Sequence, residues 1–223
     1  MVFEDRRQAG RELARALRAR HVAGADVVVL GLPRGGVVVA REVADELRAP
    51  LDVILVRKLG VPMQPELAMG AIGEGGVRVL NDAVVRETRV STDDVAMTES
   101  RERVELERRA REYRGDRDPI PLAGRVAVIV DDGIATGSTM RAACEVARRH
   151  GAARVVVAAP VAAPSTIRAL GDVTDEIVVV DAPPRFWAIG EFYRDFRATS
   201  DDEVRAALRE HRPDQYAQRP TKG

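Results

Sequence analysis

Short apolar runs rich in β-branched residues alternate with amphipathic segments along most of this chain. Five runs have the composition of buried strands: residues 26–32, 51–60, 127–132, 153–161 and 176–183. Helical periodicity is visible at residues 4–20, 36–49, 138–151 and 163–172. Strands that alternate with helices predict an α/β fold, in which helices flank a central, twisted parallel sheet. Ligands of such folds bind at the carboxyl ends of the strands.

Two stretches interrupt this alternation. Residues 82–118 are highly charged and predict a long helical insertion with Thr92 as an N-cap. The insertion is interpreted as a lid, a dimer surface or a surface for a partner. Residues 183–200 contain five aromatic side chains. The polar residues 212–223 predict a flexible tail, which leaves residues 1–211 as a single domain.

Composition argues against several classes of protein and partner. The 223 residues include 35 basic and 35 acidic side chains, so no net charge attracts nucleic acid or an anionic membrane. No apolar run approaches membrane-spanning length, and the N-terminus is too charged for a signal peptide. The single cysteine, Cys144, fits a reducing cytoplasm. Because the three histidines are scattered, we expect no metal site built by the protein alone.

Residues 128–139, VIVDDGIATGST, join a predicted strand to a predicted helix. The first N–H groups of a helix and the positive end of its dipole attract anions. Thr136, Ser138 and Thr139 add hydroxyl donors, and Gly137 lets a phosphate approach the backbone. The stretch lacks both the lysine of a Walker loop and the GxGxxG pattern of dinucleotide sites. It therefore predicts a site for one terminal phosphate.

Asp131 and Asp132 stand immediately before this turn. Ionised carboxylates only accept hydrogen bonds, whereas sugar hydroxyls donate them. A ribose 5-phosphate would place its phosphate in the turn and its 2′- and 3′-hydroxyls on the two carboxylates. An ordinary strand-to-helix turn would explain Ser138 and Thr139 as capping residues. It would not explain two charges at the end of a buried strand.

This stretch resembles the phosphoribosyl pyrophosphate signature of type I phosphoribosyltransferases: four apolar residues, two acids and a turn ending in Thr-Gly-Ser-Thr. The resemblance covers most of residues 26–181. It implies that Asp131 and Asp132 hold the ribose diol. It also implies that the 5-phosphate is bound by Ala135, Thr136, Gly137, Ser138 and Thr139.

Two further loops stand where this family handles pyrophosphate. In residues 30–40, Arg34 offers charge, while Gly35 and Gly36 permit close approach and unusual backbone angles. The resemblance implies a strained or cis peptide in this loop. A plain turn that starts a helix is the alternative interpretation.

The second of these loops, residues 57–70, occupies the place of the mobile catalytic loop of the family. There Arg57 and Lys58 would neutralise pyrophosphate, and Lys58 is the only lysine before residue 222. A solvated strand end is the alternative interpretation of this pair.

Residues 182–200 are similar to the small C-terminal hood of purine-salvage members of the family. Phe186 or Trp187 would stack on a base there, although an aromatic cluster is also typical of a core or an oligomer contact. A homodimer is one arrangement that we consider.

The resemblance implies that a nitrogenous acceptor, such as a nucleobase, displaces pyrophosphate from C1 of the ribose. Asp131, Asp132 and Lys58 are the candidate catalytic residues, and Mg²⁺ would be bound mainly through the substrate. In 6-oxopurine enzymes of the family an aspartate that handles a purine proton stands where this chain has Ala135. A hypoxanthine or guanine enzyme of the usual kind is therefore disfavoured. The alternatives are a non-catalytic sensor of phosphoribosyl pyrophosphate and, ranked last, a hydrolase.

Overall fold

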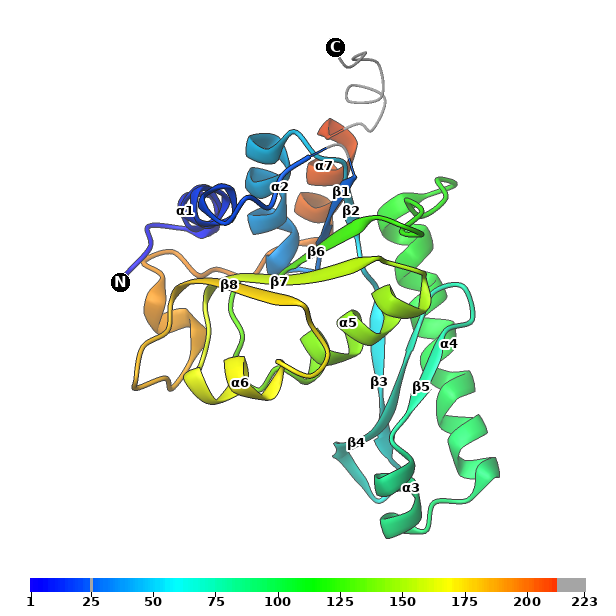
Figure 1. Cartoon of the computed structure of the whole chain (residues 1–223). Helices are drawn as coiled ribbons and strands as arrows, with labels where there is room; N and C mark the ends of the chain where they lie inside the picture. Colours follow the sequence, from blue (N-terminus) through cyan, green and yellow to red (C-terminus); the bar gives the residue numbers. More distant parts are fainter. Residues whose placement is uncertain (25, 212–223) are drawn as a thin grey trace.

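A five-stranded parallel sheet forms the centre of the molecule in the computed structural model, which describes residues 1–24 and 26–211. The strand order is β2-β1-β6-β7-β8 (Figure 1). The strands are β1 (Val27–Gly31), β2 (Leu51–Val53), β6 (Val126–Val130), β7 (Arg154–Val161) and β8 (Glu176–Asp181). The predicted α/β fold is thus confirmed. The predicted tail, residues 212–223, lies outside the described residues.

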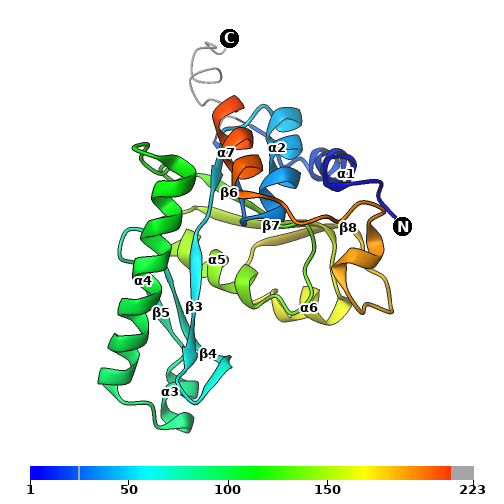
Figure 2. The ribbon, with the colours of Figure 1, turned by 180° about the vertical axis from the view of Figure 1, so that it is seen from behind.

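Helices cover both faces of this sheet (Figures 1 and 2). One face carries α1 (Arg6–Ala19) and α2 (Gly35–Leu47), and α7 (Asp201–Glu210) packs on α2. The other face carries α5 (Ser138–Arg149) and α6 (Pro164–Ala169). Val27 and Val29 of β1 belong to the first apolar core, whereas Val28 and Leu30 belong to the second. Burial on both faces explains why these strands are continuous apolar runs.

The register of β1 and β6 places the candidate loops side by side. The pairing runs in parallel from Val27 with Val126 to Gly31 with Val130, so both strands end at the same edge. The Leu32 N–H then donates to the Val130 carbonyl at 2.9 Å. Residues 33–36 and residues 131–132 therefore follow neighbouring strand ends.

The stretch predicted as one strand at residues 51–60 is divided between two sheets. β2 ends at Val53, and β3 (Val56–Val61) begins an antiparallel sheet with β4 (Gln64–Gly73) and β5 (Arg78–Leu80). Residues 57–70, which we expected to form a loop, are thus mostly a hairpin. Exposed residues fill the first half of β4, so no apolar run marked it in the sequence.

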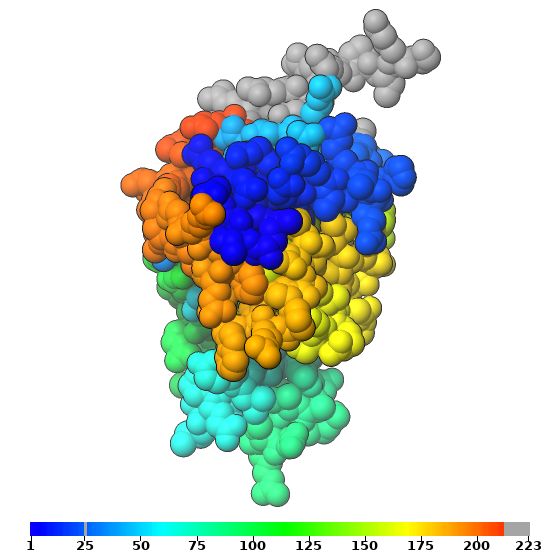
Figure 3. Space-filling view, turned by 90° about the vertical axis from the view of Figure 1, so that its left-hand side faces the viewer, coloured from blue at the N-terminus to red at the C-terminus, as the bar shows by residue number. Residues whose placement is uncertain are grey.

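The predicted helical insertion consists of two helices, α3 (Asp82–Thr88) and α4 (Thr92–Arg114). The N-cap of α4 is Ser91 rather than Thr92, because Ser91 and Asp94 form a reciprocal capping box. We call residues 56–114 the lobe, which projects from the body of the molecule (Figure 3). Within the described ranges, no helix has the length and apolar character needed to cross a membrane.

A buried ion-pair network ties the lobe to the sheet. Arg114, at the end of α4, is 7% exposed and its Nε donates to Asp52 Oδ1 at 2.7 Å. Its Nη2 donates to the Val53 carbonyl at 2.7 Å, and Nη1 pairs with Glu74 after β4. Asp52 Oδ2 accepts the Ile120 N–H at 3.0 Å. One guanidinium therefore joins the ends of α4, β2 and β4.

Replacing Arg114 with alanine is expected to lower the free energy of unfolding by about 3–5 kcal/mol, because the buried Asp52 and the partly buried Glu74 lose their cation. Urea denaturation of the variant and the parent protein measures this loss. Arg108→Ala is the control, because Arg108 is itself exposed and its ion pairs are with neighbours on α4. A loss no greater than that of the control would contradict the prediction.

Candidate functional site

Asp131 and Asp132 lie at the carboxyl end of β6, where Arg6 contacts Asp132. The Asp132 N–H donates to Asp131 Oδ1 at 2.8 Å. Arg6, from the start of α1, donates from Nε to Asp132 Oδ2 at 2.7 Å. Each carboxylate thus has one oxygen held by the protein. Among residues 1–24 and 26–211, no N–H group donates to either of the remaining two oxygens.

The two carboxylates influence each other's protonation. Burial, together with repulsion by the Asp132 charge, raises the pKa of Asp131 well above its ordinary value. Ionised Asp131 is therefore held in an unfavourable environment. A ligand that donates hydroxyl hydrogens or carries a cation would relieve it.

The turn predicted to bind phosphate is open to solvent. Gly137 has φ +77°, and a Cβ there would lie 2.5 Å from the Thr166 methyl carbon, so only glycine fits. Because α5 begins at Ser138, its first N–H groups have no partner within the helix. The Thr166 hydroxyl of α6 donates to the Ala135 carbonyl and holds the turn. The exposed residues of the turn are Ala135, Thr136, Ser138 and Thr139.

The loop after β1 contacts the two carboxylates through its glycines. A Cβ on Gly35 would lie 1.9 Å from Asp132 Oδ2, and a Cβ on Gly36 would lie 2.8 Å from the Asp131 Cα. Neither glycine has a positive φ, so neither uses the left-handed backbone angles that glycine permits. The Pro33–Arg34 peptide is cis, which confirms that part of the expectation. The glycines allow the two loops to touch.

Arg34, predicted to bind pyrophosphate, stands immediately before α2. Its side chain is 50% exposed, and its Nη1 lies 3.9 Å from Asp201 Oδ2 at the N-terminus of α7. The other oxygen of Asp201 accepts the Tyr113 hydroxyl at 2.6 Å. Burial and this carboxylate raise the pKa of Tyr113 to about 12, so Tyr113 remains a donor at neutral pH. The Asp201 carboxylate thus lies beside the Arg34 guanidinium.

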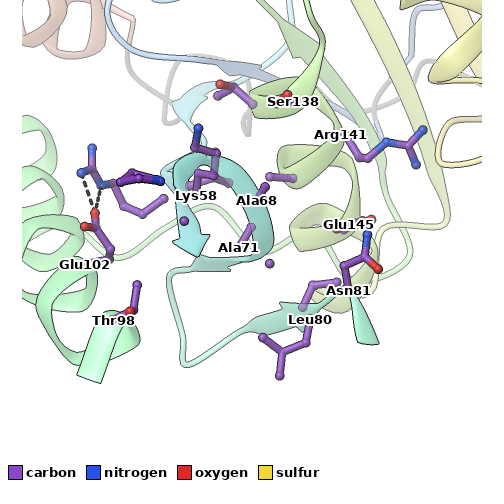
Figure 4. A pocket seen from close by; sticks show the side chains of 18 of the residues that line it. Lys58, Ala68, Ala71, Leu80, Asn81, Thr98, Glu102, Ser138, Arg141 and Glu145 are labelled. Atoms are coloured by element: carbon purple, nitrogen blue, oxygen red, sulfur yellow. Dashed lines mark hydrogen bonds and ion pairs between the residues drawn. The ribbon is translucent and has the colours of Figure 1, made fainter. Parts of the chain in front are cut away.

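Arg57 and Lys58 are consecutive on β3, so their side chains point to opposite faces of the β3–β4–β5 sheet. Arg57 donates from Nε and Nη2 to Glu102 Oε2 of α4, at 2.9 and 2.6 Å. The Lys58 Nζ lies 3.2 Å from the Glu66 carbonyl and extends toward Ser138 (Figure 4). Lys58 therefore extends toward the turn at residues 135–139. Both side chains are paired with a glutamate, because the Lys58 Nζ also lies 3.3 Å from Glu66 Oε2.

A cleft of about 1390 Å³ lies between the phosphate turn and the lobe. Residues 136–139 form one side, and Lys58 of β3 and Arg101 of α4 lie on the lobe side (Figure 4 shows the Lys58 side). Asp131 and Asp132 are not among the lining residues. Of the predicted site residues, the cleft thus brings together Arg57, Lys58 and residues 136–139.

Most aromatic residues of the predicted hood, residues 182–200, pack within a core. Phe186 stacks on Phe192, with ring centroids 5.3 Å apart, and Tyr193 lies against Phe3. Phe186 therefore already has a stacking partner. Trp187, the other residue predicted to stack on a base, is 82% exposed, so its ring is accessible.

The hood also borders the two carboxylates. The Tyr193 hydroxyl donates to the Asp132 carbonyl at 2.6 Å, and burial raises the pKa of Tyr193. Ile189, in the 3₁₀ helix η1 (Ile189–Phe192), packs against Gly133. A Cβ added to Gly133 would lie 2.5 Å from the Ile189 side chain. The hood thus closes the side of the site opposite the lobe.

Comparison with known proteins defines the class. Residues 3–187 match the family model of the phosphoribosyl transferase domain, and the chain belongs to this family. The resemblance inferred from the signature is confirmed.

Particular relatives agree with this assignment. The chain is 57% identical over 212 residues to Rv0571c of Mycobacterium tuberculosis H37Rv and to MT0597 of strain CDC 1551 / Oshkosh, whose names assign them to the phosphoribosyl transferases. These matches cover 95% of the chain but 47% of each relative, so the chain spans about half their length. The crystal structure of TT1426 from Thermus thermophilus is 45% identical with a TM-score of 0.87, over 95% of this chain and 99% of that one.

Proposed function

We propose that this protein transfers ribose 5-phosphate from phosphoribosyl pyrophosphate to a nitrogenous acceptor, a nucleobase, and releases pyrophosphate. One observation carries the proposal. The open turn at residues 135–139 and the carboxylates of Asp131 and Asp132, each with one oxygen that accepts no N–H, follow one strand and contact the loop of Arg34. This set of groups matches a ligand with a phosphate, a diol and a second anion.

The chemistry requires positioning and charge neutralisation. As pyrophosphate leaves C1, the ribose develops oxocarbenium character, and the carboxylates of Asp131 and Asp132 supply nearby negative charge. Arg34 and Lys58 would neutralise the departing pyrophosphate from the body and from the lobe. Ala135 supplies no proton acceptor, so we propose an acceptor other than hypoxanthine or guanine.

We propose that Mg²⁺ enters with the substrate. Carboxylate oxygens such as those of Asp131 and Asp132 suit this ion, which keeps several waters and needs few protein ligands. In the described part of the chain, no group of three or more His, Cys, Asp or Glu side chains could hold a metal. When bound, Mg²⁺ would neutralise pyrophosphate oxygens. A buried free thiol at Cys144 agrees with a cytoplasmic setting.

Calorimetric titration with phosphoribosyl pyrophosphate, with and without Mg²⁺, tests the proposal first. We expect Mg²⁺-dependent binding, followed by pyrophosphate release when the matching nucleobase is added. Binding without release for any nucleobase would replace the proposal with a non-catalytic sensor. Absence of binding by folded protein would reject both.

Lys58→Ala is expected to lower turnover about 100-fold while changing the affinity for phosphoribosyl pyrophosphate much less. The reason is that Lys58 extends from the lobe into the cleft, where its ammonium would neutralise the pyrophosphate as negative charge grows on it. Steady-state and single-turnover rates of pyrophosphate release measure the effect. Arg101→Ala, on the same cleft but mostly exposed on α4, is the matched control. Equal turnover by Lys58→Ala and the parent protein would remove Lys58 from the mechanism.

A further inference from the structure

Arg6 reaches the candidate ribose site from the first turn of α1, far from the signature in sequence. Its Nε donates to Asp132 Oδ2 at 2.7 Å, and its Nη1 donates to the Arg197 carbonyl at 2.8 Å. The guanidinium carbon lies 4.1 Å from the centroid of the Phe196 ring. The Arg6 side chain is only 11% exposed; its bond to Asp132 is partly buried, whereas its bond to the Arg197 carbonyl is exposed.

These three contacts fix the orientation of the guanidinium. Two hydrogen bonds define directions within its plane, and the Phe196 ring restrains the plane itself. A lysine could not reproduce this arrangement, because an ammonium has neither the planar fork nor the same stacking. Arg197 and Phe196 belong to the hood. The hood thus holds Arg6, and Arg6 in turn holds Asp132.

Arg6 also decides which oxygen of Asp132 can meet a ligand. Oδ2 is occupied by the guanidinium, and a Cβ on Gly35 would lie at the same oxygen, so the space around it is filled. Oδ1 receives no N–H from the described residues. The Tyr193 hydroxyl fixes the backbone of Asp132 from the other side. A single acceptor is therefore presented in a fixed place.

Charge supports the same role. Without Arg6 the strand end would carry two adjacent carboxylates, with no cation of the described residues within hydrogen-bonding distance. Burial and the Asp132 charge raise the pKa of Asp131, and Arg6 is the cation that acts against this rise. It does so without occupying the oxygens left for a ligand.

We propose that Arg6 is a positioning residue of the ribose site, which holds Asp132 so that its Oδ1 accepts a hydroxyl of the ribose diol. The inference rests on the proposed function. A competing role is purely structural: Arg6 would only fasten the hood to α1. The two roles differ in which ligands lose affinity when Arg6 is changed.

Three ligands separate these roles. Phosphoribosyl pyrophosphate and ribose 5-phosphate carry the diol, whereas inorganic pyrophosphate does not. Arg6→Lys is expected to weaken binding of both diol ligands about 10-fold or more and to leave the pyrophosphate affinity within about twofold. Arg6→Gln, which removes the charge but keeps an N–H donor, is the second variant. Arg7→Ala, exposed on the same turn of α1, is the control and should change none of the affinities.

A double-mutant cycle tests whether Arg6 acts through Asp132. In an Asp132→Asn background, Arg6→Lys should change the ribose 5-phosphate affinity by no more than about twofold. Equal losses for ribose 5-phosphate and pyrophosphate, or independent losses in the cycle, would overturn the positioning role. A parent protein that binds no phosphoribosyl pyrophosphate would instead reject the proposed function, and this inference with it.

Discussion

Asp131→Asn is expected to weaken phosphoribosyl pyrophosphate binding about 10–100-fold and, at the same time, to make the folded protein more stable. Binding weakens because a hydroxyl of the ribose loses a charged acceptor. Stability rises because the ionised carboxylate is unfavourable where it stands, as its raised pKa shows. Asparagine keeps the oxygen that accepts the Asp132 N–H. We expect a gain of about 0.5–2 kcal/mol, the range common for single stabilising substitutions.

The pH dependence follows from the direction of this shift. The folded state binds the Asp131 proton more tightly than the unfolded chain does, since folding raises the pKa. The contribution of Asp131 to stability is therefore fully present below the unfolded pKa and is lost as pH rises through the folded pKa. Ligand binding is expected to need ionised Asp131, so the affinity should increase as the pH rises through the folded pKa. Stability and affinity should move in opposite directions with pH, and Asp131→Asn should remove both of these dependences.

Asp132→Asn is the matched comparison. It should weaken binding to a similar degree but lower the thermal midpoint, because Arg6, 11% exposed, loses its anionic partner. Calorimetric titration and thermal unfolding across a pH range of about 5–8 measure both quantities. The double variant should not bind at all while remaining folded. Unchanged affinity in the double variant would refute the ribose-diol assignment, and a lower midpoint for Asp131→Asn would refute the electrostatic account.

Gly35→Ala is expected to lower the affinity for phosphoribosyl pyrophosphate at least about 100-fold, comparable to loss of a fully formed charged contact. A methyl group there would lie 1.9 Å from Asp132 Oδ2 and 2.7 Å from Arg6 Nε. Both of these atoms belong to side chains, so they can move aside and the fold survives. The displaced carboxylate no longer presents its free oxygen correctly. A single methyl group added to the candidate pyrophosphate loop would thus prevent ribose binding at Asp132.

Two further glycines make this prediction specific. Gly36→Ala should mainly destabilise the protein, because its Cβ would meet the Val130 carbonyl at 2.7 Å and backbone cannot move aside cheaply. At Gly171 a Cβ would lie 3.4 Å from its nearest neighbour, so Gly171→Ala should be nearly neutral. Titration calorimetry with thermal unfolding distinguishes the three variants. Normal binding by Gly35→Ala would show that the carboxylate does not need its observed position.

The sheet and the signature were predictable because each is encoded locally. Buried strands such as residues 126–130 are continuous apolar runs, and the turn at residues 135–139 carries its own glycine and hydroxyls. The position of Asp131 and Asp132 at a strand end follows from those two facts. Family membership, and with it the nature of the ligand expected, could therefore be inferred from one short stretch of the chain.

The rest of the site depends on contacts between distant segments. Arg6 lies 126 positions before Asp132, and nothing in an amphipathic helix distinguishes that arginine from its neighbours. The hairpin of β3 and β4 was missed because exposed polar residues and prolines occupy its tip. Gly35 was predicted to permit close approach of pyrophosphate, whereas the atom nearest to its missing Cβ belongs to the Asp132 carboxylate. Such roles exist only once the chain has folded.

The lobe is a single uninterrupted segment inserted between β2 and β6, and its attachment has an evolutionary consequence. The register of the five parallel strands involves no residue of the lobe. The phosphate turn, the two carboxylates and Arg6 also lie outside it. Selection can therefore lengthen, shorten or recharge the lobe wall of the cleft while the ribose site is inherited unchanged, provided that the Arg114 junction is kept. In this architecture the lobe, apart from Lys58, can vary without altering the segments that form the candidate ribose site.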